Sequence, residues 1–259
     1  MIRSLAAAAV AAALASPAFA GTTTISVQGF DPVVPTAAGP APNVWYVDRY
    51  APAGFESEFF DGDNRLALTL DDADNSAGRG AQSSSFYATQ GRKFDTPEAD
   101  SMSIEMYIDS SFDGQGRIGG LWATAVDSGD AISYYPIVEF IDDSFYAFDS
   151  LGEVSGGFID LGLPTGFTYD EWVEIGFRLD AGMIVFSLNG EDKLSLSAGG
   201  TVSFANVILQ GINADPGVDR TIYFDNLVVT GEVPVPAALP LLAGALGLLG
   251  VAARRRRRA

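Results

Sequence analysis

The chain has 259 residues with 33 acidic and 15 basic side chains, and it contains neither cysteine nor histidine. Arg3 and five terminal arginines lie outside positions 21–233, so nine basic residues stand against 33 acidic ones there, a net charge of −24. This charge excludes nucleic-acid binding, and the two missing residue types exclude Ser-His-Asp hydrolysis, Cys-His chemistry, typical zinc catalysis and disulfide bonds.

Positions 1–20 have the three parts of a secretory signal peptide. Arg3 supplies the positive charge, positions 5–14 form an apolar run that is too short to cross a bilayer, and Ala18-Phe19-Ala20 places small residues at the cleavage site. A buried N-terminal helix, the alternative, does not account for this order. We therefore expect signal peptidase to cut after Ala20.

Positions 21–54 form a proline-rich lead-in. Prolines at positions 32, 35, 40, 42 and 52 forbid a regular helix, because proline lacks the backbone N–H and has a fixed φ. We expect an irregular segment that wraps the main domain, positions 55–232, and does not fold by itself.

Short runs of alternating apolar and polar residues follow, and they predict antiparallel strands. The runs cover positions 66–70, 102–108, 173–179, 183–188, 194–196 and 222–230. Asn189-Gly190 tolerates the positive φ angles of a type I′ turn and predicts a hairpin. No helical period continues for ten residues before the C-terminal span, so the pattern favours a two-sheet sandwich.

Two segments resemble the core of concanavalin A-like (laminin-G-like) jelly rolls. Positions 170–177 (DEWVEIGF) with 185–191 (VFSLNGE) match a Trp-strand-turn-strand-Asn-Gly pattern, and positions 223–229 (YFDNLVV) are similar to the closing strand. The resemblance implies an all-β fold, an antiparallel two-sheet jelly-roll sandwich. Another kind of β-sandwich is the alternative.

The resemblance also bears on catalysis, because glycoside hydrolases with this fold use carboxylates two residues apart on one strand, about 6 to 7 Å from each other. Their ExDxxE motif is missing. Glu139 and Asp143, like Glu105 and Asp109, would share a face at about 13 Å, too far for either mechanism. We therefore expect a protein that is not an enzyme, while acids that meet across strands are left open.

Calcium is the metal that the sequence favours, because hard oxygen ligands are abundant. Positions 61–64 and 71–75 cluster acids in turns, but neither fits an EF-hand loop, and solvated turn formers are the simpler interpretation. The resemblance separately implies that Glu56 and Asp225 form a structural calcium pair, as an early Glu and an Asp of the closing strand do in carbohydrate-binding jelly rolls.

Aromatic side chains on the predicted strands are candidates for glycan binding, because a ring can stack on the apolar face of a sugar. They are Tyr107, Trp122, Tyr134, Tyr135 and Tyr146. Tyr107 is the best placed, since it lies opposite the apolar face of positions 102–108. For Trp122 and Trp172 a place in the core is the favoured interpretation, because large rings mostly fill sandwiches.

The tail, positions 233–259, has three parts. The motif Val233, Pro234, Val235, Pro236, Ala237 comes first, an uncharged span at positions 235–253 follows, and Arg254, Arg255, Arg256, Arg257 and Arg258 come last. A helix over the span reaches about 28 Å, enough to cross a bilayer with the arginines in the cytoplasm. The tail resembles a PEP-CTERM (VPLPA-CTERM) sorting signal, which implies processing by an exosortase-type membrane protease. A permanent single-pass anchor is the alternative.

These observations predict an exported cell-surface or extracellular-matrix protein that its tail holds, at least transiently, at the inner membrane. The favoured function is non-catalytic, with binding to extracellular polysaccharide. The alternatives are a glycan-cleaving enzyme on the concanavalin A-like scaffold and a purely structural matrix component.

Overall fold

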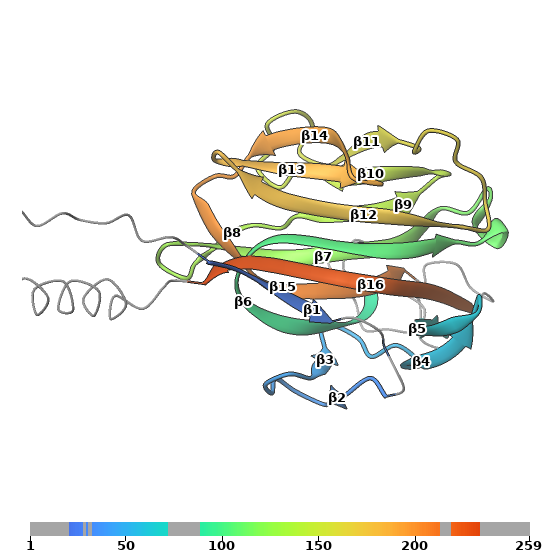
Figure 1. The fold of residues 1–259 in the computed structure, drawn as a ribbon. Coiled ribbons are helices and arrows are strands. Elements are labelled where there is room, and N and C mark those ends of the chain that lie inside the picture. Colours follow the sequence, from blue (N-terminus) through green and yellow to red (C-terminus); the bar gives the residue numbers. More distant parts are fainter. Residues whose placement is uncertain (1–20, 28–29, 31–32, 72–88, 213–218, 234–259) are drawn as a thin grey trace, which may run out of the picture. The chain divides into compact units, whose positions relative to one another are not determined.

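The structure of the chain is a computed structural model that describes residues 21–27, 30, 33–71, 89–212 and 219–233 (Figure 1). These residues form strands and one short 3-10 helix, η3 (Ser110–Phe112). No helix among them is long and apolar enough to cross a membrane. The predicted signal peptide, the predicted C-terminal span, the arginine cluster and positions 234–237 of the predicted sorting motif lie outside the described residues.

The strands of the described residues alternate with short turns along the whole domain. In chain order they are β1 (Gly21–Val27), β2 (Thr36–Ala37), β3 (Trp45–Val47), β4 (Gly54–Phe60), β5 (Asp63–Leu70), β6 (Thr89–Ile108), β7 (Arg117–Asp127), β8 (Ile132–Tyr134), β9 (Ile137–Ile141), β10 (Ser144–Phe148), β11 (Phe158–Gly162), β12 (Glu171–Asp180), β13 (Met183–Leu188), β14 (Glu191–Ser197), β15 (Thr201–Ile212) and β16 (Arg220–Val233).

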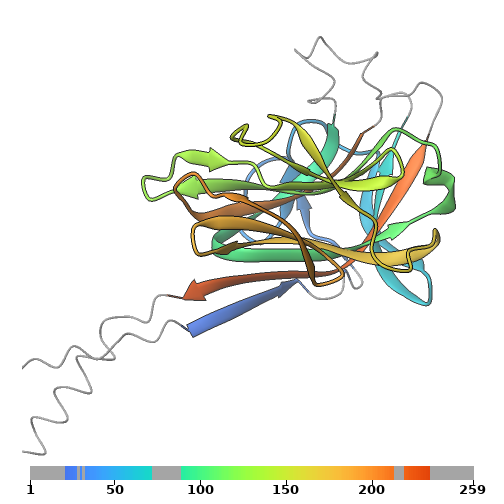
Figure 2. The same ribbon diagram turned by 90° about the horizontal axis from the view of Figure 1, so that it is seen from above.

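The long strand β6 takes part in both layers of the sandwich. Its first half pairs with β15 and β3, and its second half pairs with β12 and β16. The first layer runs β11-β10-β9-β7-β15-β6, and the second contains β14-β13-β12-β6 with β16, β5 and β4 beyond β6. The pairing is antiparallel except at β2–β3 and one isolated bridge. Figure 2 shows β1, in blue, alongside its partner β16, in red.

Apolar residues that alternate along the strands fill the space between the layers. On β6, Met102, Ile104, Met106 and Ile108 are at most 1% exposed and belong to one core cluster. Full burial of side chains of this size stabilises the fold by about 1.5 to 3 kcal/mol each. The predicted all-β jelly-roll sandwich is thus confirmed.

Type I′ turns connect several neighbouring strands. Asn189 and Gly190 have φ angles of 49° and 73° between β13 and β14, so the predicted hairpin is confirmed. Ala181 and Gly182 connect β12 and β13 in the same way, with φ angles of 48° and 81°. The positive φ at Ala181 is a conformation that alanine seldom adopts.

The proline-rich lead-in is more ordered than its composition predicts. It contributes β3, which pairs with β6, and its Trp45 is only 1% exposed. The Trp45 ring packs on Phe55 and Phe94, with centroids 5.2 and 5.4 Å apart. Part of the lead-in therefore belongs to the sandwich itself.

The loop between β10 and β11 is organised by one buried carboxylate. Asp149 accepts hydrogen bonds from the backbone N–H groups of Glu153, Val154, Ser155 and Gly156, at 2.7 to 3.3 Å. Burial alone would raise the pKa of Asp149, but the four donors outweigh it and hold the pKa at about 2, below the ordinary 3.8. The ionised carboxylate therefore stabilises the folded loop.

We expect Asp149→Asn to lower the free energy of unfolding at pH 7 by about 1 to 2 kcal/mol, because a neutral amide accepts hydrogen bonds less strongly. The folded pKa is depressed, so the stabilisation is complete above the unfolded pKa of 3.8 and is lost as pH falls through about 2. Urea unfolding between pH 5 and pH 2 should show a smaller acid loss in Asp149→Asn than in the parent. Asp130→Asn, at an exposed position, is the control, and equal acid loss in parent and Asp149→Asn would contradict this role.

Candidate functional site

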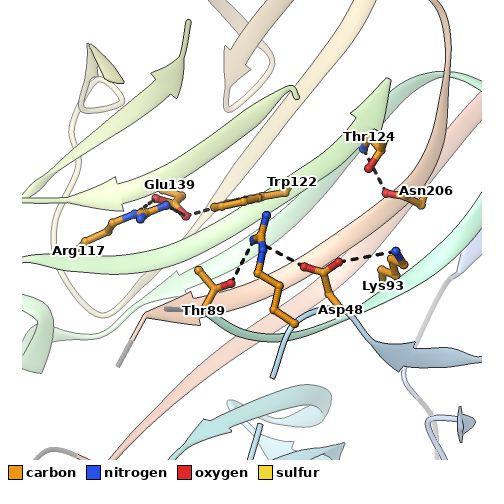
Figure 3. A network of polar contacts seen from close by, with 9 residues as sticks. Asp48, Thr89, Lys93, Arg117, Trp122, Thr124, Glu139 and Asn206 are labelled. Carbon is orange, nitrogen blue, oxygen red and sulfur yellow. Dashed lines mark hydrogen bonds and ion pairs between the residues drawn. The ribbon is translucent and has the colours of Figure 1, made fainter. Parts of the chain in front are cut away.

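The outer face of the first layer carries a network of polar contacts around Trp122 and Glu139 (Figure 3). Arg117 donates to Glu139 Oε2 from Nε at 2.5 Å and to Glu139 Oε1 from Nη2 at 2.9 Å, and Trp122 Nε1 donates to Oε1 at 2.7 Å. Both oxygens of this fully buried carboxylate are therefore occupied. Removing one partner of such a pair leaves a buried charge, so its role is structural.

The network continues across β6 to the lead-in. Asp48 forms ion pairs with Arg49 and Lys93 at 3.7 Å, and Arg49 donates to Thr89 Oγ1 at 3.3 Å. The Arg49 guanidinium also lies 5.1 Å from the centre of the Trp122 ring. Because Glu139 and Trp122 are at most 1% exposed, this face does not offer them to a ligand.

The structure does not bring the five predicted glycan-binding residues together, although Trp122 donates to Glu139 and Tyr146 lies directly opposite Glu139. Both Trp122 and Tyr134 are 1% exposed, Trp122 in a small cluster with Ile137 and Ile208 on the outer face and Tyr134 in the main core. Burial raises the pKa of Tyr134 to about 12. Tyr135 is exposed at the end of β8, and Tyr146 is half-buried on β10. Tyr107, half-buried on the outer face of β6, lies against the rings of Phe60 and Trp172.

The outer face of the second layer brings three carboxylates into one cross-strand row. Glu105 on β6 lies directly opposite Glu174 on β12 and directly opposite Asp225 on β16. Directly opposed residues have Cβ atoms about 4.5 to 5.5 Å apart. Glu105 and Glu174 are half-buried, and Asp225 is 3% exposed. We call Glu174, Glu105 and Asp225 the acidic row.

Two polar residues hold the acidic row in place. Asn226 donates from Nδ2 to Glu105 Oε2 at 2.7 Å, and Arg65 forms an ion pair with Asp225. Like charges directly opposite each other are destabilising, so the Arg65 charge reduces the repulsion within the row. The Arg65 guanidinium also lies 5.0 Å from the centre of the Trp172 ring, and it links the row to the neighbouring rings.

Four half-buried rings border the acidic row, and we call Phe60, Tyr107, Trp172 and Tyr223 the aromatic group. Tyr107 and Trp172 are direct cross-strand partners with centroids 5.3 Å apart. Phe60 stacks on Tyr223 at 3.8 Å and meets Tyr107 edge-on at 4.9 Å. Rings beside carboxylates are the combination that a sugar-binding site requires.

The turn at Asp61-Gly62 positions the β4–β5 hairpin beside the aromatic group, and the left-handed residue Asn226 positions the acidic row. Asp61 and Gly62 have φ angles of 49° and 84°, a type I′ turn for which Asp-Gly is favoured, so the β4–β5 hairpin is tight. Asp61 Oδ2 accepts from Trp172 Nε1 at 2.8 Å, which ties the hairpin tip to β12. Asn226 has a φ of 49° where the β16–β6 register shifts, a left-handed conformation that asparagine tolerates.

The phenols of the aromatic group are kept protonated. Burial raises the pKa of Tyr107, and nearby carboxylates, Asp170 foremost, raise it further. Burial likewise raises the pKa of Tyr223, whose hydroxyl donates to Glu58 Oε2 at 3.1 Å. Both hydroxyls therefore keep their proton at neutral pH, and that of Tyr223 is donated to Glu58 while that of Tyr107 can be donated to a ligand.

A polar pocket of about 380 Å³ opens beside the aromatic group. It is lined by Asp109, Ser111, Gln115, Asp219, Arg220, Thr221 and Tyr223. Tyr223 thus belongs to both the pocket and the aromatic group. The volume falls in the range of small-molecule sites, and the lining offers donors and acceptors for hydroxyl groups.

The predicted calcium pair occupies two different cross-strand rows. Glu56 is exposed on β4 and lies opposite Ala67, which in turn lies opposite Tyr223. Asp225 is buried two positions further along β16, in its ion pair with Arg65. Among the described residues, no three acidic side chains form a group that could hold a metal ion, while positions 72–75 lie outside them. Calcium binding by Glu56 and Asp225 stays a prediction.

Sequence reasoning missed the acidic row and most of the aromatic group. The spacing along one strand relates Glu105 only to Asp109. The carboxylates next to Glu105 come from β12 and β16, about 70 and 120 positions later in the chain. The signal that could have found Glu174 is its place in the alternating run at positions 173–179, where it points away from the core. The partner strand cannot be identified from such a run.

No family model matches the chain, and no curated protein matches its sequence. Solved structures match its fold. The catalytic domain of an endo-1,3-β-glucanase (laminarinase) from Thermotoga petrophila is 13% identical with a TM-score of 0.54, over 82% of this chain and 99% of that one. A non-specific endo-β-1,3(4)-glucanase of family GH16 is 12% identical with a TM-score of 0.52, over 82% and 92%. An endo-acting O-glycanase of the human gut microbiota has the same identity and TM-score, over 82% and 100%.

These matches overturn the prediction that the chain is not an enzyme. That prediction rested on the missing ExDxxE motif and the absence of histidine, yet the solved structures with this fold include catalytic domains of glycan-cleaving enzymes. The sequence shows only which acids share one strand, whereas Glu105 and Glu174 are paired across two strands. The chain has the jelly-roll scaffold on which such enzymes are built.

Proposed function

We propose that the chain cleaves glycosidic bonds in an extracellular polysaccharide, with Glu105 and Glu174 as the catalytic carboxylates. The observation that carries the proposal is the direct opposition of these residues on β6 and β12, next to the aromatic group. The glycan-cleaving enzymes that share the fold support the reaction class. The substrates named for those enzymes are therefore the first to test on this chain: β-1,3-glucan, β-1,3(4)-glucan and mucin O-glycans.

The spacing of the two carboxylates favours retention of the anomeric configuration. Cβ atoms of opposed residues lie about 4.5 to 5.5 Å apart, so two glutamates on one face can place their carboxyl groups at the roughly 5 Å found in retaining glycosidases. Glu105, oriented by Asn226, is the nucleophile that forms the bond to the anomeric carbon. Glu174 donates its proton to the departing glycosidic oxygen, then takes a proton from the water that breaks the glycosyl–Glu105 bond.

The surrounding residues bind and orient the sugar. Trp172 and Tyr107 form the aromatic wall beside the two acids, and the Tyr107 hydroxyl is a donor for a sugar oxygen. Asp225 keeps its charge balanced by Arg65, so it supports the row without entering the reaction. The pocket next to Tyr223 accommodates a further part of the glycan chain.

Glu105→Gln and Glu174→Gln should each reduce the release of reducing ends from the cleaved polysaccharide by at least about 100-fold, because general acid and nucleophilic carboxylates contribute factors of this size. Both changes preserve side-chain shape, and in Glu105→Gln the new amide oxygen can still accept from Asn226, so melting temperatures should stay close to the parent value. Reducing-end assays with the purified full chain check the rates. Proton NMR of the first products should show the retained anomer.

Glu191→Gln is the matched control, because Glu191 is an exposed carboxylate on β14 of the same layer. It should keep the parent activity. Full activity in Glu105→Gln or Glu174→Gln would refute the assigned roles, and an inverted product would refute the retaining mechanism. A parent chain that releases no reducing ends from any of the three substrates would count against the function itself.

The proposal extends to how the protein reaches its substrate. The signal-peptide pattern at positions 1–20 supports export through signal peptidase, and the three-part tail supports sorting by an exosortase-type membrane protease. The inner membrane then holds the protein for a time, and the processed chain is released to the cell surface or the extracellular matrix.

The intact mass of the extracellular protein tests this route. We expect a mass that matches a chain beginning at Gly21 and ending near Glu232, because the sorting motif begins at Val233. A mass that matches residues 21–259 would show a permanent anchor and contradict processing. A mass that still includes residues 1–20 would contradict cleavage by signal peptidase.

A further inference from the structure

Exposed apolar side chains gather at one end of the sandwich. Of the eight large apolar side chains that are exposed among the described residues, five lie in the loops and strand ends there. They are Ile132 (57% exposed), Tyr135 (40%), Leu151 (45%), Val154 (69%) and Val202 (55%), and we call them the end patch. Scattered apolar residues are normal on a protein surface, but a contiguous group marks an interaction site.

Direct contacts show that the segments carrying the end patch are neighbours. The Ser133 hydroxyl beside Ile132 lies 2.8 Å from the Thr201 hydroxyl beside Val202. Ser150, beside Leu151, accepts from the Tyr135 backbone N–H at 3.3 Å.

The loop that carries Leu151 and Val154 also contacts the β14–β15 connection. Glu153 Oε2 accepts from the Ser197 backbone N–H at 3.0 Å, and a Cβ at Gly199 would lie 2.6 Å from Leu151 Cδ1. The end patch is therefore one surface formed by three segments of the chain.

The last strand of the domain finishes at the same end. Gly231 on β16 lies opposite Ala99 on β6, which lies opposite Phe204 on β15, two residues after Val202. Figure 1 and Figure 2 both show the arrowhead of β16 and the turn between β7 and β8 on the same side of the domain. The chain thus leaves the domain next to the end patch.

We propose that the end patch rests on the surface of the lipid bilayer while the tail is inserted, an inference that rests on the membrane tether proposed above. The span begins at position 235, four residues after Gly231. At no more than about 3.6 Å per residue, those four residues keep this end within roughly 15 Å of the hydrocarbon core.

Because the tail already holds the domain at the membrane, a few apolar side chains are enough to keep the end patch on the bilayer. Linking two modules through a short connection raises their effective concentration, so weak apolar contacts suffice to orient the domain. Aliphatic side chains and a tyrosine suit the headgroup region, where tyrosine is enriched in membrane proteins.

The negative charge of the protein determines which lipid headgroups the end patch can contact. Positions 21–233 carry a net charge of −24, and Glu153 lies between the end-patch residues Leu151 and Val154 in the chain. Anionic headgroups repel such a surface, so the occupant is a zwitterionic bilayer.

The docked orientation leaves the proposed catalytic site accessible. The polar pocket includes Thr221 and Tyr223, near the start of β16, whereas the end patch lies where β16 finishes. Ten residues of strand between Thr221 and Gly231 span about 33 Å. The pocket therefore opens far from the membrane, toward the extracellular polysaccharide.

The absence of cysteine allows a direct test with single introduced cysteines. Leu151→Cys and Val154→Cys in the full chain are labelled with a polarity-sensitive fluorophore and reconstituted into phosphatidylcholine vesicles. Leu163→Cys is the matched control, because Leu163 is 40% exposed and follows β11 at the opposite end, beside the β9–β10 turn. We expect several-fold stronger quenching by lipid-attached spin labels at positions 151 and 154 than at 163.

The outcomes separate the docking inference from the tether. Labels at 151 and 154 that are quenched no more than the label at 163, in protein that floats with the vesicles, would overturn docking and leave the tether intact. Protein that does not float with the vesicles would overturn the tether and the inference together. Stronger quenching in vesicles with anionic lipid than in phosphatidylcholine would overturn the assignment of a zwitterionic surface.

Discussion

The pairing of β6 in both layers is the constraint on which the rest of the structure depends. A single strand of 20 residues binds β15 and β3 with one half and β12 and β16 with the other. Its second half is therefore central in the second layer, with a partner on each side. That position gives Glu105 two carboxylate neighbours and gives Tyr107 aromatic neighbours from β4 and β12.

The outer faces of the two layers differ in how their carboxylates are paired. On the first layer, Arg117 and Trp122 satisfy both oxygens of Glu139, so a charge that would be costly inside the protein becomes a fixed structural contact. On the second layer, Arg65 forms an ion pair with Asp225, while Glu105 and Glu174 lie directly opposite each other and are half-buried.

The alternation of apolar residues was sufficient to predict the strands, because each run at positions 102–108, 173–179 and 183–188 has one buried face. Asn189-Gly190 likewise predicted its hairpin, since the turn is local. The register between distant strands is not local. Glu105 and Glu174 become neighbours only once β6 and β12 pair, and no pattern in either run specifies that partner, so the candidate site had to come from the structure.

The pairing of β1 with β16 joins the first strand after the expected cleavage site to the last strand before the tail. The β1–β16 pair therefore cannot form until β16 has been made. Contacts between segments so distant in the chain also form slowly. A polypeptide that is still being made lacks one member of the pair. For the export proposed above this delay is useful, since the unfolded chain can pass through a secretion channel until its last strand has been made.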